Sequence, residues 1–322
     1  MSLVSVIISA YNSSNFIEET LESIFMQSWS EIELIITDDH STDDTVDISF
    51  GWVKRKGHRF SRVEILTSDV NTGVSANANR GMKAASGNWI KFIGADDTLK
   101  KDCIRDNMEW VILNPEIKVL LSCVEIYQDT ISPASLVGLV PNEKHEHGWL
   151  LDHDRSACSQ YKMLLVSDRI NNSPSMFIDR AALMSVGGFD ENYRLLEDYP
   201  LWLNLTGRGV KIHFMNKTTV NYRRHSGAIK NKTAKSIISA NYFAQEEFRK
   251  VYTYPYLPLD IKWAQRYKWY SSWIFRIESF NKDRVLNKAL FKLLTVWLNP
   301  FAYFFLIKKL IYPALRYDEF YL

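Results

Sequence analysis

The first hundred residues alternate between short apolar runs and segments with helical spacing. Leu3 to Ala10 is apolar and β-branched, which is typical of a central strand in a parallel sheet. The next segment carries apolar residues at positions 16, 17, 21, 24 and 25, the spacing of one helix face. The pattern therefore predicts a strand, a turn at residues 12–15 and a helix.

The same alternation continues to residue 93. It predicts strands at Glu33–Thr37, Val63–Thr67 and Trp89–Ile93, and helices at Thr42–Val53 and from the Asn71-Thr72-Gly73 loop to Gly87. Strands that alternate with helices predict an α/β fold with a parallel, doubly wound sheet. Residues 104–185 are less regular, and aromatic-rich helices are expected from Lys230 onward.

Two of these strands end in paired carboxylates. Asp38-Asp39 follows the second strand and Asp96-Asp97 the fourth. Acids at the C-terminal ends of such strands lie in the crevice where open α/β sheets bind ligands. Since carboxylates repel phosphate, two pairs meeting there suggest a divalent metal that bridges them to a phosphorylated ligand.

Composition and charge narrow the class of protein. The chain has 322 residues and a net charge of +2, so nothing global indicates nucleic acid. Its three cysteines are too scattered for a disulfide framework, and reduced thiols in a cytoplasmic protein are expected. The N-terminal run lacks the basic start of a signal peptide, and no apolar run reaches the length of a membrane span.

Two later segments carry further polar groups. Gly187-Gly188-Phe189-Asp190 reads as a turn, and Glu197-Asp198 begins a helix in which Pro200 is tolerated. Residues 143–154 are rich in histidine and acid but lack metal-ligand spacing, so a solvated or mobile loop is expected there.

Five segments in this order resemble family 2 glycosyltransferases, over about residues 3 to 225. They are Val4–Asn12, Asp38-Asp39, Asn71–Ser75, Ala95–Asp97 and Gly187–Asp190 through Glu197-Asp198. The resemblance implies the glycosyltransferase-A fold, a Rossmann-like, mostly parallel sheet flanked by helices. The expected domains are a catalytic domain at 1–229 and an aromatic, basic helical extension at 230–322. Within the first, residues 1–100 would form the nucleotide-binding half and 101–229 the acceptor-binding half.

The resemblance also implies the nucleotide contacts. Ser9, Tyr11 and Asp39 would hold the base, and Asp96 would contact the ribose or a metal-bound water. A carboxylate acceptor opposite an imide N–H selects uracil or thymine, which fits Asp39. The alternative for Asp39 is a turn-forming or helix-capping role.

Asp97 and His225 would bind Mn²⁺ or Mg²⁺ by the same resemblance. The alternatives are that the acids cap a helix after Thr98 and that His225 is a surface residue. Two departures from the family stand out: Gly94 replaces a frequent aspartate, and Ala78 replaces a frequent arginine. The residues that could substitute for that arginine are Asn77, Asn79 and Arg80.

Asp198 is the expected catalytic base, with Glu197 orienting the acceptor or the base. An inverting transfer needs one carboxylate to deprotonate the acceptor hydroxyl. The alternative is that both acids only stabilise a helix N-terminus.

The function implied is an inverting transfer of one sugar from a nucleotide-diphosphate donor, UDP-linked by preference, to a saccharide acceptor. A lipid-linked oligosaccharide in O-antigen, capsule or other surface-polysaccharide synthesis is the expected acceptor. A catalytically silent nucleotide-sugar-binding module and a nucleotidyltransferase are the alternatives. Gln265–Trp269 nearly matches a motif of processive relatives, which we attribute to chance.

The segment from Arg284 to Tyr317 has six Lys or Arg residues and no acid. An apolar helical stripe runs from Leu286 to Trp297, Pro300 breaks it, and Phe301–Ile307 follows. This composition predicts an interfacial helix, which would place the protein peripherally at the inner face of the cytoplasmic membrane. The alternative is that this face packs on the catalytic domain.

Overall fold

The computed structural model describes residues 2–141, 154–194, 196–225, 227, 236–238 and 240–311. The predicted polar loop at 143–154 lies outside these ranges except for Asp154. Two compact units are present, one of residues 1–161 with 169–225 and one of residues 162–168 with 226–322. Helix α5 (Ala157–Val166) therefore contributes to both.

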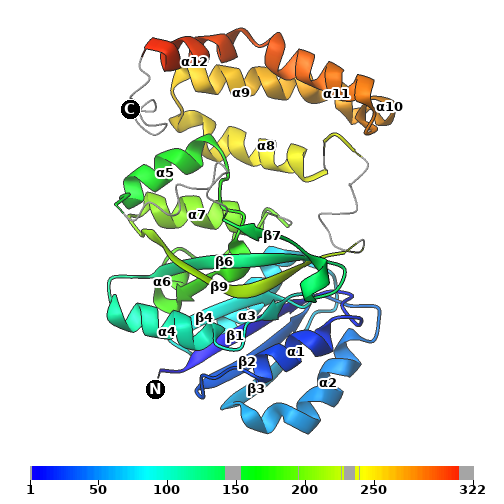
Figure 1. Cartoon of the computed structure of the whole chain (residues 1–322), viewed down its shortest axis with the longest axis vertical. Helices are drawn as coiled ribbons and strands as arrows, with labels where there is room; N and C mark the ends of the chain where they lie inside the picture. The colour runs from blue at the N-terminus through cyan, green and yellow to red at the C-terminus, as the bar shows by residue number, and fades with distance from the viewer. Residues whose placement is uncertain are drawn as a thin grey trace. The chain divides into compact units, whose positions relative to one another are not determined.

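The first unit opens with the predicted alternation (Figure 1). Its first elements are β1 Val4–Ala10, α1 Ile17–Phe25, β2 Ile32–Asp38, α2 Thr45–Lys56, β3 Arg62–Thr67, α3 Val74–Ala84 and β4 Trp89–Gly94. Helix α2 is displaced by three residues from its predicted range. The reason is that Asp43 accepts the Ser14 and Thr45 N–H groups and holds residues 42–44 in a loop. Helix α3 ends at Ala84 instead of Gly87, because the Ser86 and Gly87 N–H groups turn to Glu33.

The less regular middle region adds strands to the same sheet. Its elements are β5 Thr98–Leu99, α4 Cys103–Leu113, β6 Val119–Gln128, β7 Leu136–Val140, the short helix η4 Ser173–Ser175, β8 Phe177–Asp179, α6 Arg180–Ser185, α7 Asp198–Gly207 and β9 Ile212–Arg224.

A nine-stranded sheet results, in the order β3-β2-β1-β4-β8-β6-β9-β5, with β7 paired to β6. The strands β3, β2, β1 and β4 are parallel, as are β6 and β9, whereas β8 is antiparallel to both neighbours. This mixed but mostly parallel sheet with flanking helices confirms the predicted fold class.

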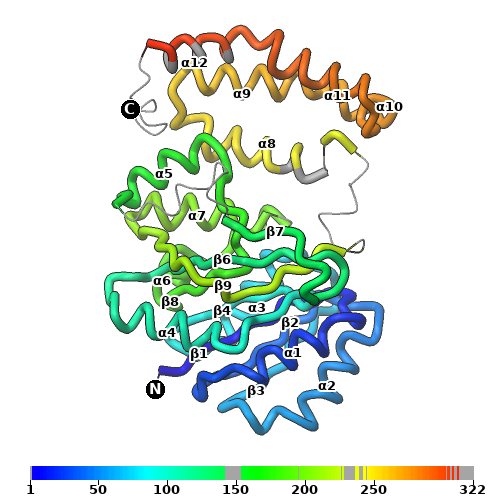
Figure 2. Tube along the Cα trace, viewed as in Figure 1, coloured from blue at the N-terminus to red at the C-terminus, as the bar shows by residue number. Residues whose placement is uncertain are grey.

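The two faces of β1 pack on different helices. Val4, Val6 and Ile8 are fully buried and share one core with α1, α2 and α4. The opposite face carries Ile7, against which α3 packs so closely that a Cβ at Gly81 would lie 2.4 Å from the Ile7 Cγ2. The tube in Figure 2 follows these parallel strands through the unit. Alternate residues of β1 thus anchor helices on both faces of the sheet.

A buried glutamate, Glu33, lies near the N-terminal end of β2, at the end of the sheet opposite to the strand C-termini. Glu33 is fully buried on β2 and accepts hydrogen bonds from Ser86, Gly87 and the Ser5 hydroxyl. These bonds outweigh burial and lower the pKa of Glu33. Arg62 on β3 pairs with it at 3.3 Å.

The second unit is helical. Its helices are α8 Ala240–Tyr252, α9 Leu259–Ser272, α10 Glu278–Asn281, α11 Val285–Lys292 and α12 Pro300–Ile311. The basic tail packs on α9: Phe301 stacks on Trp263 at 6.2 Å, and Asn299 donates to the Ala264 carbonyl. Gln265 on α9 donates to the Val166 carbonyl, a structural bond that accounts for one residue of the near-match at 265–269.

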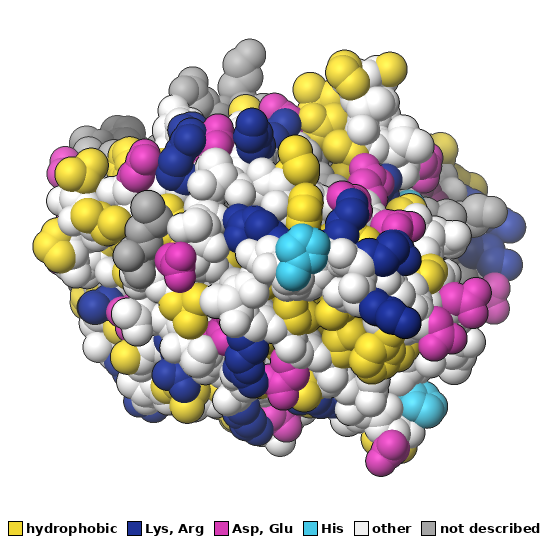
Figure 3. All heavy atoms as spheres, turned by 90° about the horizontal axis from the view of Figure 1, so that it is seen from below, with side chains coloured by type: hydrophobic (Ala, Val, Ile, Leu, Met, Phe, Trp, Pro, Cys, Tyr) yellow, Lys and Arg dark blue, Asp and Glu magenta, His cyan; other side chains and the backbone are white. Residues whose placement is uncertain are grey.

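Surface and hydropathy add two observations. On the face seen in Figure 3, basic and acidic side chains are interspersed, in keeping with the net charge of +2. Within the described ranges, no helix is both long and apolar enough to cross a bilayer.

Candidate active site

The predicted ligand residues lie at one edge of the sheet. In the parallel register, Ser9 on β1 is level with Thr37 on β2 and with Gly94 on β4. The Asp39 and Ala95 N–H groups bond back to β1, at the Ala10 and Ser9 carbonyls. The residues that follow these strands are therefore neighbours in the crevice outside the sheet.

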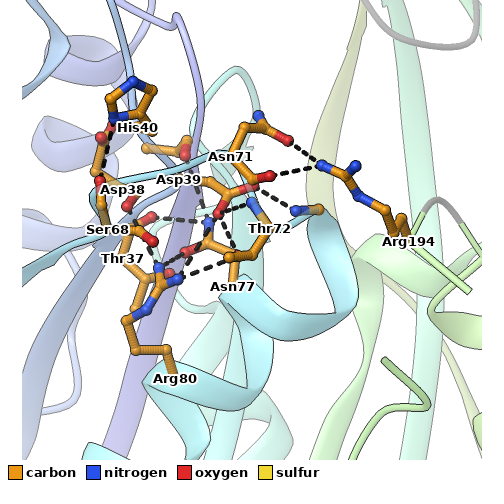
Figure 4. A network of polar contacts seen from close by, with 12 residues as sticks. Thr37, Asp38, Asp39, His40, Ser68, Asn71, Thr72, Asn77, Arg80 and Arg194 are labelled. Carbon is orange, nitrogen blue, oxygen red and sulfur yellow. Dashed lines mark hydrogen bonds and ion pairs between the residues drawn. The ribbon is translucent and has the colours of Figure 1, made fainter. Parts of the chain in front are cut away.

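The acids of the first pair have different partners (Figure 4). Asp38 forms the local turn, since its carboxylate accepts the Ser41 N–H at 2.8 Å and the Ser41 hydroxyl at 2.5 Å. Asp39 reaches the loop before α3 instead, where it accepts the Thr72 N–H at 2.9 Å and the Gly73 N–H at 2.7 Å. The turn-forming role considered for Asp39 thus belongs to Asp38.

These bonds correct the expectation that both acid pairs face a metal. The carboxylates of Asp38 and Asp39 are almost fully buried and are directed at backbone N–H groups of their own domain. Of the two pairs, Asp96-Asp97 is therefore the candidate for a cation site, as described below.

Arg80 is the replacement cation beside Asp39. Its guanidinium lies 3.7 Å from the Asp39 Oδ1 and donates to the Asn77 side chain and the Thr72 hydroxyl (Figure 4). Asn79 points elsewhere and holds the predicted turn, because it exchanges hydrogen bonds with the Phe189 backbone. Among the three candidates, Arg80 is thus the one whose charged group lies beside Asp39.

Arg194 closes the outer side of the α3 N-terminus. Its guanidinium donates to the Asn71 carbonyl at 2.6 Å and to the Asn71 side chain at 2.8 Å (Figure 4). Its backbone carbonyl accepts the Val74 N–H, and its Cα lies 3.1 Å from the position a Cβ would take at Gly73. Gly73 has a φ of +94°, so both its conformation and this close approach require glycine.

Ser9 and Tyr11 lie beside this network at the end of β1. Tyr11 is 43% exposed, so its side chain is accessible to a ligand. Asn12, with a left-handed φ of 49°, lies in the turn after β1 and bonds to the Ser41 and Thr42 segment after β2. The turn after β1 is thereby fixed against the turn after β2.

The second acid pair is held by an arginine from β9. Asp97 accepts the Arg223 N–H at 2.8 Å, and the Arg223 guanidinium donates to the Asp96 carbonyl and to Glu19. From the other side, the Thr20 hydroxyl donates to the Ala95 and Asp97 carbonyls. The helix-capping alternative for this pair is wrong, because strand β5 follows it and Asp97 is bonded to β9.

His225 is a neighbour of Asp96. Its Nε2 lies 3.0 Å from the Asp96 Oδ2, and its ring lies 4.5 Å from the Phe16 ring. The side chain is only 15% exposed, so the alternative of a surface histidine is wrong. The sequence alone did not indicate Arg223, although it lies only two residues before His225, near the end of β9 (Ile212–Arg224).

Gly94 leaves room for the Asp96 carboxylate. A Cβ at residue 94 would lie 2.7 Å from the Asp96 Oδ1 and 3.5 Å from the Asp97 Oδ2. An aspartate at this position would force Asp96 to move. Glycine in place of the frequent aspartate at position 94 therefore permits the orientation that the Asp96 carboxylate has here.

The donor set fits a hard divalent cation. Burial, followed by the charge of Asp96, raises the pKa of Asp97 well above its ordinary range. A cation beside the two carboxylates would relieve this cost, and carboxylate oxygens are the ligands that Mg²⁺ and Mn²⁺ prefer. Among the described residues, no three His, Cys, Asp or Glu side chains form a ready-made metal cluster, so ligand phosphates would have to complete the shell.

Lys91 is a buried cation beneath the Asp96-Asp97 turn. It is fully buried in the middle of β4, and its Nζ donates to the Pro174 carbonyl at 2.6 Å. Burial lowers the pKa of Lys91 to about 8, against the opposing charges of Cys103 and Asp97. A single lysine within an apolar strand is the sequence signal for this buried cation, and it was not among the residues predicted for the site.

Asp198 is the first residue of α7, with Glu197 at the cap position. One carboxylate oxygen accepts the Tyr199 N–H at 2.8 Å, and the other accepts the Ser173 hydroxyl at 2.6 Å. The bond from the Tyr199 N–H fits the helix-end role considered for Asp198. The bond from Ser173, 25 residues away in sequence, is not explained by that role. Sequence reasoning missed Ser173.

A mostly parallel sheet with acids at its C-terminal edge, completed by antiparallel β8, is the arrangement of a glycosyltransferase-A fold. Solved structures share it. The structure of Staphylococcus aureus TarS 1–349 with UDP-GlcNAc matches at a TM-score of 0.55 and 17% identity, over 98% of this chain and 77% of that one. The mannosyltransferase PcManGT of Pyrobaculum calidifontis, with GDP-Man and Mn²⁺, matches at 0.52 and 17%, over 98% and 76%.

Sequence comparison identifies the family. The profile of glycosyl transferase family 2 matches residues 5–167. The Escherichia coli protein WfaP, a UDP-Glc:alpha-D-GlcNAc-diphosphoundecaprenol beta-1,3-glucosyltransferase, is 30% identical over 238 residues, 74% of this chain and 84% of WfaP. Bacillus subtilis TuaG, named for teichuronic acid biosynthesis, is 26% identical over 78% of this chain and 90% of its own length. The chain belongs to glycosyl transferase family 2 and is a glycosyltransferase, which excludes the nucleotidyltransferase alternative.

Proposed function

We propose that this protein transfers one sugar, with inversion, from a UDP-sugar to a saccharide carried on a lipid diphosphate, in surface-polysaccharide synthesis. The observation that carries the proposal is the meeting of two groups of residues at one sheet edge. Ser9, Tyr11 and Asp39 follow β1 and β2, and the Asp96-Asp97 turn follows β4. The substrates named for WfaP and the ligand of the TarS complex support this donor and acceptor.

The uracil ring would lie against Tyr11 with its N–H directed at Asp39. The Asp39 Oδ2 accepts the Gly73 N–H, and a carboxylate oxygen can accept a second hydrogen bond. Arg80, 3.7 Å from Asp39, places a positive charge beside this carboxylate. Cytosine has no N–H at that ring position, so the arrangement favours uracil.

Asp97, with His225 beside Asp96, would hold Mn²⁺ or Mg²⁺. When bound, the metal offsets the charge that develops on the leaving diphosphate. Asp96 would contact the ribose or a metal-bound water. Arg223 and Thr20 fix the turn that presents both acids, so the site is held in place before any ligand binds.

Asp198 would act as the base. It accepts the proton of the acceptor hydroxyl while that oxygen forms a bond to the anomeric carbon of the donor. The bond from this carbon to the β-phosphate oxygen breaks on the opposite face, and UDP leaves with the electron pair. Asp198 later returns the proton to water, and Glu197 orients the acceptor.

The helical unit would contact the membrane that holds the acceptor. Its exposed side chains include Trp297 at 66% and Phe304 at 62%, in a segment rich in basic residues. Aromatic and aliphatic groups beside cations suit the interface of an anionic bilayer. The proposed place of action is the inner face of the cytoplasmic membrane.

UDP release in the presence of GlcNAc-diphospho-lipid acceptor tests the proposal. In a screen of UDP-, GDP- and dTDP-sugars with Mn²⁺, only a UDP-sugar should give nucleotide release that depends on the acceptor. Asp198→Asn should bind UDP normally but turn over about 10²–10⁴-fold more slowly. A protein that binds UDP-sugars yet releases no UDP with any acceptor would instead be a silent binding module.

A further inference from the structure

The contacts of Asp198 extend to a turn that no part of the proposed function uses. This turn is the helix η4, Ser173–Ser175, with Asn172 before it. Only Ser173 in it touches a predicted catalytic group: its hydroxyl donates to the Asp198 Oδ2 at 2.6 Å, among the contacts of the described residues. Since the Tyr199 N–H bonds the other oxygen, both carboxylate oxygens of Asp198 are oriented by the protein.

The turn itself is rigidly mounted. The buried side chain of Asn172 donates to the Ser122 carbonyl at 2.8 Å, and the Ser122 N–H donates to the Ser175 hydroxyl at 2.9 Å. The hydroxyl of Ser175 donates in turn to the Asn172 carbonyl at 2.6 Å. These bonds fasten the turn to the middle of β6 on both sides of Ser173.

A buried charge provides the remaining anchor. Lys91 is fully buried on β4 and donates to the Pro174 carbonyl at 2.6 Å. Pro174 has a restricted φ, which limits the conformations open to the turn. The side chain that contacts Asp198 is thus carried by a backbone fixed to two strands of the sheet, β4 and β6, which flank β8. Such support is required of a group that must hold another within a fraction of an ångström.

We propose that Ser173 is a positioning residue for the base: its hydroxyl holds the Asp198 carboxylate in the orientation that receives the acceptor proton. The inference rests on the proposed role of Asp198. During transfer, the oxygen that does not receive the proton keeps the Ser173 bond, and no proton moves to or from serine. Without this bond the carboxylate turns about its side-chain torsions while the donor site is untouched.

The expected result is a loss of turnover without a loss of donor binding. Ser173→Ala should lower kcat by about tenfold to a hundredfold, the cost of a misplaced reacting group, and leave the Kd for UDP and the Tm unchanged. Ser173→Thr keeps the hydroxyl and should retain most of the activity. Ser185→Ala is the matched control, since that exposed hydroxyl donates to the Ala182 carbonyl at the end of α6.

A double-mutant cycle separates this inference from the proposed function. If Ser173 acts through Asp198, adding Ser173→Ala to Asp198→Asn should cost nothing further. An equal additional loss in that background, or an equal loss in the Thr and Ala variants, would overturn the positioning role. Normal turnover of Ser173→Ala with an inactive Asp198→Asn would reject this inference alone. A fully active Asp198→Asn would reject the base assignment itself.

Discussion

Adjacent residues of the same type have different tasks here because their partners differ. Asp38 and Asp39 are neighbours in sequence, yet one bonds to Ser41 in its own turn and the other to the loop before α3. Asp96 and Asp97 also have different partners: His225 lies beside Asp96, and the Arg223 backbone N–H bonds Asp97. In each pair, backbone geometry rather than residue type decides which acid is available to a ligand.

Asp97→Asn should remove the metal dependence of nucleotide binding. Wild-type protein should bind UDP more tightly with Mn²⁺ than with chelator, because the metal links phosphate to a buried carboxylate. The variant should show the same UDP affinity in both conditions, measured by titration calorimetry.

Asp47→Asn is a matched control for that experiment, because Asp47 is an exposed acid in the first turn of α2. It should behave as wild type. Equal UDP affinity of the wild-type protein with Mn²⁺ and with chelator would refute the metal assignment.

Glu33→Gln should change the acid stability of the domain. The pKa of Glu33 is lowered in the folded state, so its ionised form contributes stability at neutral pH. That contribution begins to fall as the pH approaches the unfolded pKa, about 4.3, and is lost below the folded pKa. The variant should be less stable by about 1–3 kcal/mol at pH 7 and should lose less stability between pH 5 and 3. Urea unfolding across this range measures both effects, and parallel curves for the two proteins would contradict the prediction.

At the scale of elements, the spacing between α3 and β1 sets the position of the nucleotide loop. Gly81 in α3 faces Ile7 with no space for a side chain, and the same helix begins directly after Gly73, whose N–H bonds Asp39. Through these contacts, α3 connects strand β1 to the loop that bonds Asp39.

Gly81→Ala should push α3 away from the sheet. We expect a loss of about 1–3 kcal/mol in the free energy of unfolding, typical of overpacking, together with weaker UDP binding. Gly51→Ala in α2 is the matched control, because a Cβ there meets only the flexible end of Arg55 at 3.5 Å. It should stabilise the protein by about 0.5–1 kcal/mol. Both values come from denaturant unfolding, and a tolerant Gly81→Ala would show that α3 can shift freely.

The sequence indicated the elements better than the contacts between them. Periodicity located β1, β2 and β4, and the acids after β2 and β4 followed from their strand ends. The residues that hold those acids come from far along the chain, as with Arg223 at Asp97 and Ser173 at Asp198. No local pattern specifies a pairing of this kind. Lys91 illustrates the limit, since its burial was visible in the strand pattern but its carbonyl partners were not.

At the scale of the whole molecule, exposed apolar side chains are concentrated in the helical unit. The tail was predicted to have one lipid-facing stripe, but part of it packs within the helical unit. Phe291 packs edge-on against Phe275, just after α9, at 5.1 Å, and Phe301 stacks on Trp263 of α9. Removing the tail would uncover α9, so truncation is a poor test of membrane contact. Single side chains on the exposed face are better targets.

Replacing Trp297 and Phe304 by alanine should weaken sedimentation with anionic vesicles. Each aromatic side chain contributes about 1.5–3 kcal/mol when buried in lipid, so we expect about a tenfold loss or more per residue. High salt should reduce the remaining binding, because the basic residues act through screened charges. Leu113→Ala, at a 79% exposed position in the first unit, is the control. Unchanged vesicle binding of the double variant would exclude this face from the membrane contact.

The last turn of helix α5 can complete its hydrogen bonds only late in the synthesis of the chain. The end of this helix belongs to the second unit, where the Val166 carbonyl accepts hydrogen bonds from Arg249 and Gln265. Arg249 and Gln265 are synthesised 83 and 99 residues after Val166. The C-terminal turn of α5 therefore lacks these two hydrogen bonds while β8, the Asp198 helix α7 and β9 are synthesised. A chain released after His225 would carry that turn permanently without Arg249 and Gln265.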